Sequence, residues 1–348
     1  MIAETITKLA HKKDLSYDEM SNVMNDILDG RSSDQDTTNF LKSLTAKGES
    51  DDELLAMLDI MQEHAIHIQP KCTGRLIDVC GTGGDKKLTF NVSTTAAFVI
   101  AASGGNVAKH GNRSSSGISG SADIFEYFGY DLNMEPNKTR ELIEKFHIGF
   151  MFAQKFHPAM RNVAEARKTL GTRTAFNLLG PLSNPAGVKN QLVGVSSAPY
   201  LERIATLLRS RGAEEIMTVI SDDGLDELST TSKNRICHLK DDKIHSFVLD
   251  PTELGLTRSN LADIQVTTKE EAIRSFVSVL DNTGGKAKSD VTALNAAAGL
   301  VVGKVSERLE EALDIAFDTI NSGRAFNLFR DFIKYCGDIS KVEELTKN

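Results

Sequence analysis

Hydrophobic residues change their spacing along the chain near residue 70. Before that point they recur at helical intervals, as between Leu54 and Met61. Ser16–Glu19 and Ser50–Glu53 each have the capping-box pattern of serine followed three residues later by glutamate, which is typical of a helix start. The pattern therefore predicts an all-helical domain over residues 1–70.

From about residue 74 the hydrophobic residues form short runs rich in valine and isoleucine. Such runs occupy 76–80, 106–108, 191–195 and 215–220, with helical patterns between or after them. This alternation predicts an α/β fold with a mostly parallel central sheet flanked by helices.

Two later runs flank a short polar turn, which predicts an antiparallel hairpin over 235–249. Helical patterns return from about residue 269. We expect the α/β domain to span 74–346, with part of the stretch of about 170–190 packing on the helical domain.

Composition narrows the class of protein. The chain has 348 residues, of which 40% are hydrophobic and 25% are charged, as in ordinary globular proteins with a substantial core. The net charge of −8 argues against a general nucleic-acid partner. The first residues do not resemble a signal peptide, and no segment has the roughly 20 apolar residues of a membrane helix. We therefore expect a cytoplasmic protein without a membrane partner.

A glycine-rich loop is the first candidate for chemistry. Gly81–Asp85 follows the run Leu76–Cys80 and precedes a helical pattern. Glycines let backbone N–H groups approach a ligand, and the start of a helix leaves several of those donors unpaired. Such a corner favours phosphate, although a tight turn without a ligand is the alternative. The loop matches neither the Walker A motif nor the dinucleotide fingerprint.

A second loop, Lys109–Ser121, has the same construction. It follows a short strand and precedes a helix that Ser121 is expected to cap. Lys109 and Arg113 bring positive charge, while serines supply hydroxyl donors and glycines free the backbone. Two such loops predict a ligand with phosphate at two places, such as a sugar phosphate diphosphate.

An acidic segment follows the run 215–220. It contains Asp222, Asp223, Asp226 and Glu227. A solvated turn is the plain interpretation. With two anion-binding loops in the chain, a magnesium site is the sharper one, because Mg²⁺ is commonly shared between one or two carboxylates and substrate phosphates.

A fourth element combines apolar residues with a few polar ones and suits a flat organic substrate. It runs from Phe156 through the helix that ends near Gly171, and continues over Ala175–Pro185. Arg167 can pair with a carboxylate through its planar guanidinium, although many helix arginines simply face water. His157 is interpreted as a helix-start residue rather than as a general base.

Taken together, these motifs resemble those of the anthranilate phosphoribosyltransferases. The resemblance covers nearly the whole chain and rests on five motifs in order, which are Gly81–Asp85, Asn91–Thr94, Lys109–Arg113, Asn177–Pro181 and Asp226–Glu227. Pyrimidine nucleoside phosphorylases share the architecture. Their Lys-His-Ser-Thr-Gly-Gly signature is absent, because Lys109-His110 continues as Gly111-Asn112-Arg113.

The resemblance implies a reaction and an assembly. The amino nitrogen of anthranilate attacks C1 of 5-phosphoribosyl 1-diphosphate (PRPP) and expels diphosphate, giving N-(5-phosphoribosyl)anthranilate in tryptophan biosynthesis. The helical domain is expected to form a homodimer interface, and the substrates to bind at the junction of the two domains. Contact with anthranilate synthase is a further implied partnership.

The resemblance also assigns roles to residues, but it assigns no covalent nucleophile and no general base. The residues expected to bind PRPP are Gly81, Gly84, Asp85, Thr89, Asn91, Val92, Ser93, Thr94, Lys109, His110, Gly111, Asn112, Arg113, Ser114, Ser115, Ser116, Gly117 and Ser121. Those expected to hold magnesium, as two ions, are Ser93, Asp226 and Glu227. Those expected to bind anthranilate are Gly81, Asn112 and Arg167, with His110, His157 and Met160 along its path.

One residue departs from the family pattern. Lys86 follows Gly83-Gly84-Asp85, where the family often has glycine, so Lys86 or Lys87 is a candidate for an added phosphate contact. Two alternatives remain: a nucleoside phosphorylase, and a non-catalytic nucleic-acid-binding relative of the same fold. The acidic composition and the retained phosphate and magnesium motifs disfavour the nucleic-acid-binding relative.

Overall fold

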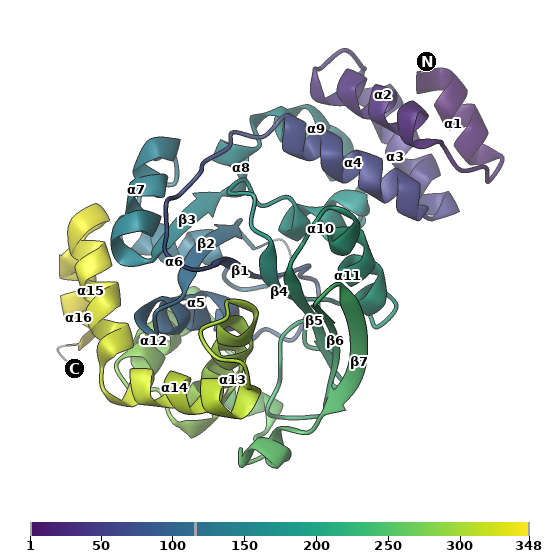
Figure 1. Ribbon diagram of the computed structural model, residues 1–348. Coiled ribbons are helices and arrows are strands. Elements are labelled where there is room, and N and C mark those ends of the chain that lie inside the picture. The colour runs from purple at the N-terminus through teal and green to yellow at the C-terminus, as the bar shows by residue number, and fades with distance from the viewer. Residues whose placement is uncertain (1, 115–116, 347–348) are drawn as a thin grey trace. The chain divides into compact units, whose positions relative to one another are not determined.

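The computed structural model describes residues 2–114 and 117–346 and divides into two compact units (Figure 1). The helical unit combines Met1–His67 with Ala153–Pro185, and the α/β unit combines Ile68–Phe152 with Ala186–Asn348. The middle segment of the helical unit is longer than the stretch of about 170–190 that the sequence analysis associates with it. No helix in the described part of the chain is long and apolar enough to cross a membrane.

The helical unit is built from an N-terminal set of four helices and three short helices from the middle of the chain. Its α-helices are α1 (Ile2–Ala10), α2 (Tyr17–Leu28), α3 (Asp34–Lys47), α4 (Asp51–Glu63), α8 (Ala153–Phe156), α9 (Arg161–Leu170) and α10 (Ala175–Leu179). Short 3₁₀ turns are η1 (Pro158–Met160) and η2 (Gly180–Leu182). Both predicted capping boxes, at Ser16 and Ser50, are present. Helix α9 packs on α2 and α3, and α10 packs on α4.

The α/β unit contains a seven-stranded sheet in the order β3-β2-β1-β4-β5-β6-β7. Its strands are β1 (Leu76–Gly81), β2 (Asn106–Gly111), β3 (Ile148–Phe152), β4 (Asn190–Gly194), β5 (Glu215–Ser221), β6 (Asn234–Lys240) and β7 (Lys243–Leu249). The strands from β3 to β5 pair in parallel, and β6 and β7 add antiparallel pairs at one edge. The predicted mostly parallel sheet and the β6–β7 hairpin are confirmed.

Strand β3 was missed by the sequence analysis. It starts one residue after α7 (Pro136–Phe146), and the single connecting residue, His147, has a φ of 59°. The turn is so short that the apolar run Ile148–Phe152 follows the helix with no glycine or proline to mark a boundary.

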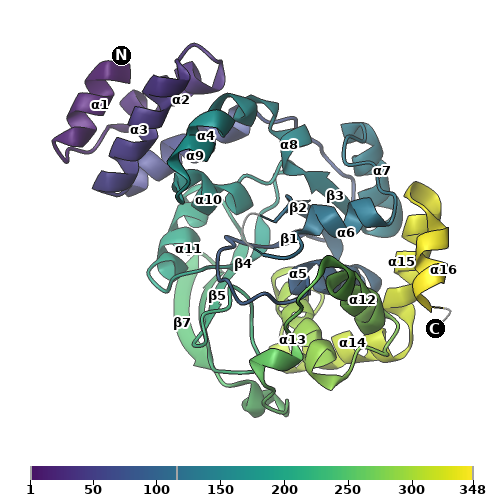
Figure 2. The same ribbon diagram turned by 180° about the vertical axis from the view of Figure 1, so that it is seen from behind.

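Two layers of helices cover one face of the sheet. Helices α5 (Val92–Ala102) and α13 (Lys286–Val302) pack on the strands, and α12 (Lys269–Leu280), α14 (Leu309–Asn321) and α15 (Arg324–Cys336) pack against α5 or α13 (Figure 2). Met217 and Val219 of β5 join the core on that side, whereas Thr218 between them donates to Leu201 O of α11 (Tyr200–Ser210). Because side chains alternate along a strand, α11 lies on the opposite face. The remaining helices of the unit are α6 (Ser121–Tyr127) and α16 (Ile339–Thr346), with turns η3 (Pro251–Leu254) and η4 (Leu261–Asp263).

The strand order places a switch point next to β1. The chain passes from β1 outward to β2 and β3, and then returns to the other side of β1 with β4. Ligands of such sheets bind beyond the carboxyl ends of the strands at this point. Gly81 and Gly194, paired in register, end β1 and β4 there.

Candidate active site

The glycine loop and the acidic segment meet at this switch point. Gly83 N–H donates to Asp226 Oδ2 at 2.7 Å, and Thr82 N–H donates to Gly194 O at 2.9 Å. A Cβ on Gly81 would lie 2.7 Å from Asp226 Oδ2, and one on Gly194 would lie 1.5 Å from Asp226 O. Both glycines are therefore required for the close approach. Gly194 was not singled out by the sequence analysis, although a glycine within a strand pattern is a signal for such an approach.

The two carboxylates that the family resemblance assigns to magnesium, Asp226 and Glu227, are consecutive in the chain and lie at this corner. Asp226 is 9% exposed, and Glu227 accepts a hydrogen bond from the backbone of Ser93, the second residue of α5. Burial raises the pKa of Asp226, and Asp85 raises it further; burial and Asp226 likewise raise the pKa of Glu227. Among the described residues, no lysine or arginine forms an ion pair with either carboxylate, although the nearby Lys109 ammonium opposes the rise in the pKa of Glu227. Their mutual repulsion is what a bound divalent cation would relieve.

The oxygen ligands at this corner suit Mg²⁺, and by themselves they do not form a complete coordination shell. Among the described residues, no group of three or more histidine, cysteine, aspartate or glutamate side chains is placed to hold a metal ion. Two carboxylates and the Ser93 hydroxyl supply only oxygen donors and leave coordination positions for other ligands. Mg²⁺ typically binds one or two carboxylates and completes its shell with water and phosphate.

Lys109 lies inside the sheet rather than on the surface of the second loop. It is 2% exposed, and its Nζ donates to Val79 O at 2.6 Å and to Ser93 Oγ at 3.3 Å. Burial lowers the pKa of the ammonium, while the nearby Asp78 carboxylate opposes that effect. The next residue, His110, donates its backbone N–H to Asp78 Oδ1 at 3.2 Å.

Carboxylates of α6 organise the described part of the second loop. Arg113 donates to both carboxylate oxygens of Glu126 at 2.6 Å each, and this pair raises the pKa of Arg113. Asp123 Oδ2 accepts from Gly120 N at 2.8 Å. The prediction that Ser121 caps the helix is wrong. Ser121 is the first helical residue, and Gly120 occupies the cap position.

Smaller contacts join the two loops. Asn91 Nδ2 donates to Ser119 O at 3.1 Å, while Asn91 Oδ1 is buried without a hydrogen-bond partner among the described residues. Ser121 Oγ donates to Asn112 O at 3.3 Å, and Ser114 Oγ accepts from Gly117 N at 2.7 Å. Two predicted contacts, Ser115 and Ser116, lie outside the described residues. The Asn91 oxygen is therefore a buried acceptor with no partner among the described residues.

The rest of the first loop is held by a segment that the sequence analysis did not connect with it. Thr89 forms a β-bridge with Gln265, whose Nε2 also donates to Lys87 O at 2.8 Å. Lys86 has a φ of 57°, in the left-handed region that glycine adopts without strain. A glycine, which the family resemblance leads us to expect at this position, would adopt this φ without strain. Asp85 Oδ1 accepts from Lys87 N at 3.2 Å.

The predicted anthranilate contacts Arg167, His157 and Met160 belong to the helical unit. Arg167 lies over the ring of Phe176, with 5.7 Å between its Cζ and the ring centroid, and burial lowers its pKa. No carboxylate of the described chain pairs with it. His157 is buried at the start of η1, and burial lowers its pKa to about 4, so the imidazole is neutral at pH 7. A half-buried, unpaired guanidinium beside an aromatic ring suits an aromatic carboxylate.

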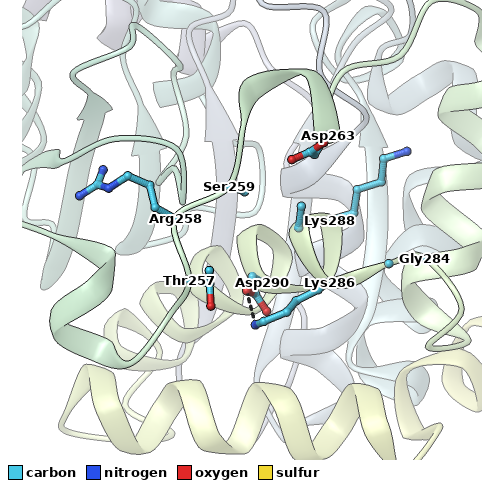
Figure 3. A pocket seen from close by; sticks show the side chains of 10 residues that line it. Thr257, Arg258, Ser259, Asp263, Gly284, Lys286, Lys288 and Asp290 are labelled. Carbon is cyan, nitrogen blue, oxygen red and sulfur yellow. Dashed lines mark hydrogen bonds and ion pairs between the residues drawn. The ribbon is translucent and has the colours of Figure 1, made fainter.

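A separate pocket of the α/β unit has a volume of about 420 Å³ and contains none of the predicted site residues. Figure 3 shows Lys286 turned toward Asp290, which it contacts at 2.6 Å, while Arg258 and Lys288 point away from the centre. Arg258 pairs with Asp250 at 2.6 Å, and Lys288 donates to Ser275 Oγ at 2.7 Å. Two of the pocket's three cations, Arg258 and Lys286, are thus paired with carboxylates.

Sequence comparisons place the chain among known enzymes. Residues 73–326 match the family described as "Glycosyl transferase family, a/b domain", and residues 3–65 match "Glycosyl transferase family, helical bundle domain". The anthranilate phosphoribosyltransferase of Nitrosopumilus maritimus is 61% identical over 345 residues, 99% of either chain. That of Cenarchaeum symbiosum is 47% identical over 337 residues, 97% of this chain and 98% of the relative. The chain belongs to the anthranilate phosphoribosyltransferase family.

Solved structures of this family agree in fold. The enzyme from Thermus thermophilus superposes with a TM-score of 0.88 at 36% identity, covering 95% of this chain and 99% of that one. The Saccharomyces cerevisiae enzyme in complex with PRPP and Mg gives 0.85 at 25% identity, covering 99% and 98%. The predicted family, fold class and enzyme class are thereby confirmed.

Proposed function

We propose that this chain transfers the phosphoribosyl group of PRPP to the amino nitrogen of anthranilate, releasing diphosphate. One observation carries the proposal: the glycine loop, the start of α5 and the acid pair converge at the switch point of the sheet. Gly83 N–H lies 2.7 Å from Asp226 Oδ2, and the backbone of Ser93 bonds Glu227. Backbone donors for phosphate and carboxylates for a cation thus share one corner.

The phosphate-binding residues follow from the two loops. Backbone N–H groups of the glycine loop and of the α5 start are the donors for the diphosphate, since a helix start leaves such groups unpaired and carries partial positive charge. Asn91, with its unmatched buried oxygen, accepts from the ribose hydroxyls. The second loop, from Lys109 to Gly117 with Ser121, encloses the phosphate groups.

Ser93, Asp226 and Glu227 are the residues that would hold magnesium, and we propose two ions. Bound with the diphosphate, Mg²⁺ neutralises charge on the leaving group. The chain contributes fixed N–H dipoles aimed at the same charge, and such pre-oriented electrostatic stabilisation is usually the largest catalytic effect.

Arg167 and Phe176 form the core of the proposed anthranilate site in the helical unit. Gly81 and Asn112 stay anthranilate contacts predicted from the family resemblance. The guanidinium pairs with the carboxylate, and the ring covers an aromatic face. Because His157 is neutral at pH 7, it contributes polarity without adding a cation. An aryl amine is already unprotonated near neutral pH, so orienting it toward C1 is the main task and no general base is assigned.

The test is a direct assay with purified protein, anthranilate, PRPP and Mg²⁺, following the loss of anthranilate fluorescence. We expect turnover that requires all three additions. Arg167→Ala should raise the KM for anthranilate about tenfold or more, because a hydrogen bond to a charged group contributes roughly 1.5–3 kcal/mol. Arg161→Ala, an exposed arginine on the same helix, is the control.

An unchanged anthranilate KM in Arg167→Ala would remove the carboxylate contact. Phosphorolysis of thymidine without phosphoribosyl transfer would replace the proposed activity by that of a nucleoside phosphorylase. The domain limits 1–70 and 74–346 and a cytoplasmic location stay proposals from the sequence pattern. A homodimer through the helical domain and contact with anthranilate synthase stay proposals from the family resemblance. Gel filtration tests the homodimer, and pull-down with the synthase tests the second assembly.

A further inference from the structure

The acidic pair Asp226 and Glu227 lies between two buried leucines. Leu225 is 1% exposed and Leu228 is 0% exposed, and each packs in a hydrophobic cluster of the α/β unit. The backbone on both sides of the pair is therefore shielded from water, where its N–H and C=O groups need partners within the protein. Side chains supply partners on both sides.

Asn295 holds the backbone that follows the pair. Its Oδ1 accepts from Leu228 N–H at 3.0 Å, and its Nδ2 donates to Leu228 O at 2.8 Å. Asn295 is 0% exposed and belongs to α13, which packs on β1, β4 and β5. Its amide also donates to Val291 O at 2.8 Å, within the same helix. Both ends of the amide thus fix one short segment to a core helix.

Ser221 and Asp223 hold the backbone that precedes the pair. Ser221, the last residue of β5, accepts at Oγ from Leu225 N–H at 3.0 Å and donates its own N–H to Leu225 O at 3.1 Å. The Ser221 hydroxyl donates to Asp223 Oδ1. The other oxygen of Asp223 accepts from Ser229 Oγ at 3.3 Å and from the hydroxyl of Thr231. Asp223 therefore connects the residues before the pair with those after it.

We propose that Asn295 and Asp223 are positioning residues that fix the backbone on both sides of Asp226 and Glu227, so that the two carboxylates stay at the corner where the glycine loop begins. This inference rests on the proposed function, which places PRPP and magnesium at that corner. The family resemblance assigns no role to either residue. Asn295 is 67 residues from Leu228 in the chain, so only the fold brings it there.

The physical reason for such supports is repulsion within the acidic pair. Asp226 is buried and Glu227 is half-buried, so like charges at adjacent positions repel with little screening by water. Movement of the segment toward solvent would relieve that repulsion and disperse the carboxylates. A segment held at both ends keeps them in place before a cation binds. Side chains that orient metal ligands in this way commonly change metal affinity about 10- to 100-fold when they are mutated.

The experiment compares Asn295→Leu, Asn295→Ala and Asp223→Ala with two matched controls. Thr292→Val removes a buried polar group from the same helix, where the Thr292 hydroxyl bonds the backbone of that helix. Asp281→Ala removes a carboxylate that accepts from the backbone and the hydroxyl of Thr283 at a different turn.

Three quantities are measured on each protein, with the melting temperature recorded on the same samples. Binding of Mn²⁺ in the presence of inorganic diphosphate is followed by electron paramagnetic resonance, with Mn²⁺ in place of Mg²⁺. Backbone hydrogen exchange of the peptide covering 222–231 is recorded on the ligand-free protein. The third quantity is the Mg²⁺ concentration that half-saturates turnover with anthranilate and PRPP.

We expect Asn295→Leu, Asn295→Ala and Asp223→Ala each to weaken Mn²⁺ binding about tenfold or more, because the supports of the carboxylates are lost. The half-saturating Mg²⁺ concentration should rise by a similar factor, and exchange in 222–231 should be faster. The controls should lower the melting temperature and leave Mn²⁺ binding and exchange in 222–231 within twofold. This contrast separates support of the acidic pair from a general loss of stability.

Mn²⁺ binding within twofold of the unmodified protein in Asn295→Leu or in Asp223→Ala overturns the proposal, as does an equal loss in the controls. Asn295→Ala, whose smaller side chain leaves room for water at Leu228, answers the question if Asn295→Leu does not fold. If the unmodified protein binds Mn²⁺ with diphosphate but transfers no phosphoribosyl group from PRPP, the proposed function fails. Mn²⁺ binding and hydrogen exchange need no turnover, so they still decide the roles of Asn295 and Asp223.

Discussion

Gly194→Ala is the sharpest perturbation of the site, because it adds one carbon at the point where β4 meets the acidic segment. The added Cβ would lie 1.5 Å from Asp226 O and 2.4 Å from Asp226 C. Both neighbours are backbone atoms, so no side-chain rotation relieves the overlap. The backbone at Asp226 must retreat by about 2 Å to reach ordinary van der Waals contact at 3.4 Å or more.

The expected loss follows from that displacement. A misplacement of about 1 Å can cost about 100-fold in rate, and overpacking typically costs 1–3 kcal/mol of stability. Moving Asp226 also breaks its bond with Gly83 N–H. We therefore expect kcat/KM for PRPP to fall at least 100-fold.

The assay is anthranilate fluorescence over a PRPP titration at fixed Mg²⁺, with thermal unfolding recorded on the same samples. Gly299→Ala is the matched control: its Cβ would lie 2.3 Å from Ile100 Cδ1, so it also overpacks the unit, but at a helix core. It should lower the melting temperature and leave kcat/KM within threefold. Gly194→Ala activity within threefold of the unmodified protein would refute the reasoning.

Three further changes have expected outcomes. Asp226→Asn with Glu227→Gln should abolish most turnover yet stabilise the metal-free protein at pH 8. Burial raises the folded-state pKa of both carboxyls above the unfolded values, so the stability of the unmodified protein in EDTA falls as pH rises from about 4 through the folded pKa. The neutral amides of the double variant remove that fall. A melting-temperature difference between the variant and the unmodified protein that does not grow between pH 5 and 8 contradicts this. Lys86→Gly should raise the melting temperature by about 1 °C, because glycine adopts the left-handed φ without strain. Relief of that strain is worth roughly 1–2 kcal/mol, which exceeds the roughly 0.4–1 kcal/mol that the added entropy of the unfolded chain costs. Lys87→Gly is the control, and equal destabilisation by the two substitutions would count against the prediction. Glu126→Gln should lower the PRPP KM two- to fivefold by freeing Arg113, since an exposed ion pair contributes at most about 1 kcal/mol; an unchanged KM would mean that Arg113 does not bind phosphate.

Local pattern was enough to predict the class of fold and the location of the loops. The alternation of β-branched runs with helical patterns predicted the parallel sheet, and capping boxes predicted the starts of α2 and α4. Glycine and proline, which usually mark the boundary between two elements, are absent where the single residue His147 joins α7 to β3, so β3 was not predicted. The helix cap was predicted at Ser121 because serine is a common cap residue, but Gly120 occupies the cap position.

The sequence by itself determined which chemistry is present: glycine and serine loops for phosphate, adjacent carboxylates for a cation, and an arginine for a carboxylate. These properties are local, since each depends on residues a few positions apart. Only the tertiary structure decided how they combine. It brought Asp226 against Gly194 and Gly83, paired Arg113 with Glu126, and joined β1 to β2 through the side chains of Asp78 and Lys109. Such contacts depend on strand order and register, which join residues distant in the chain and leave no periodic signal in the sequence.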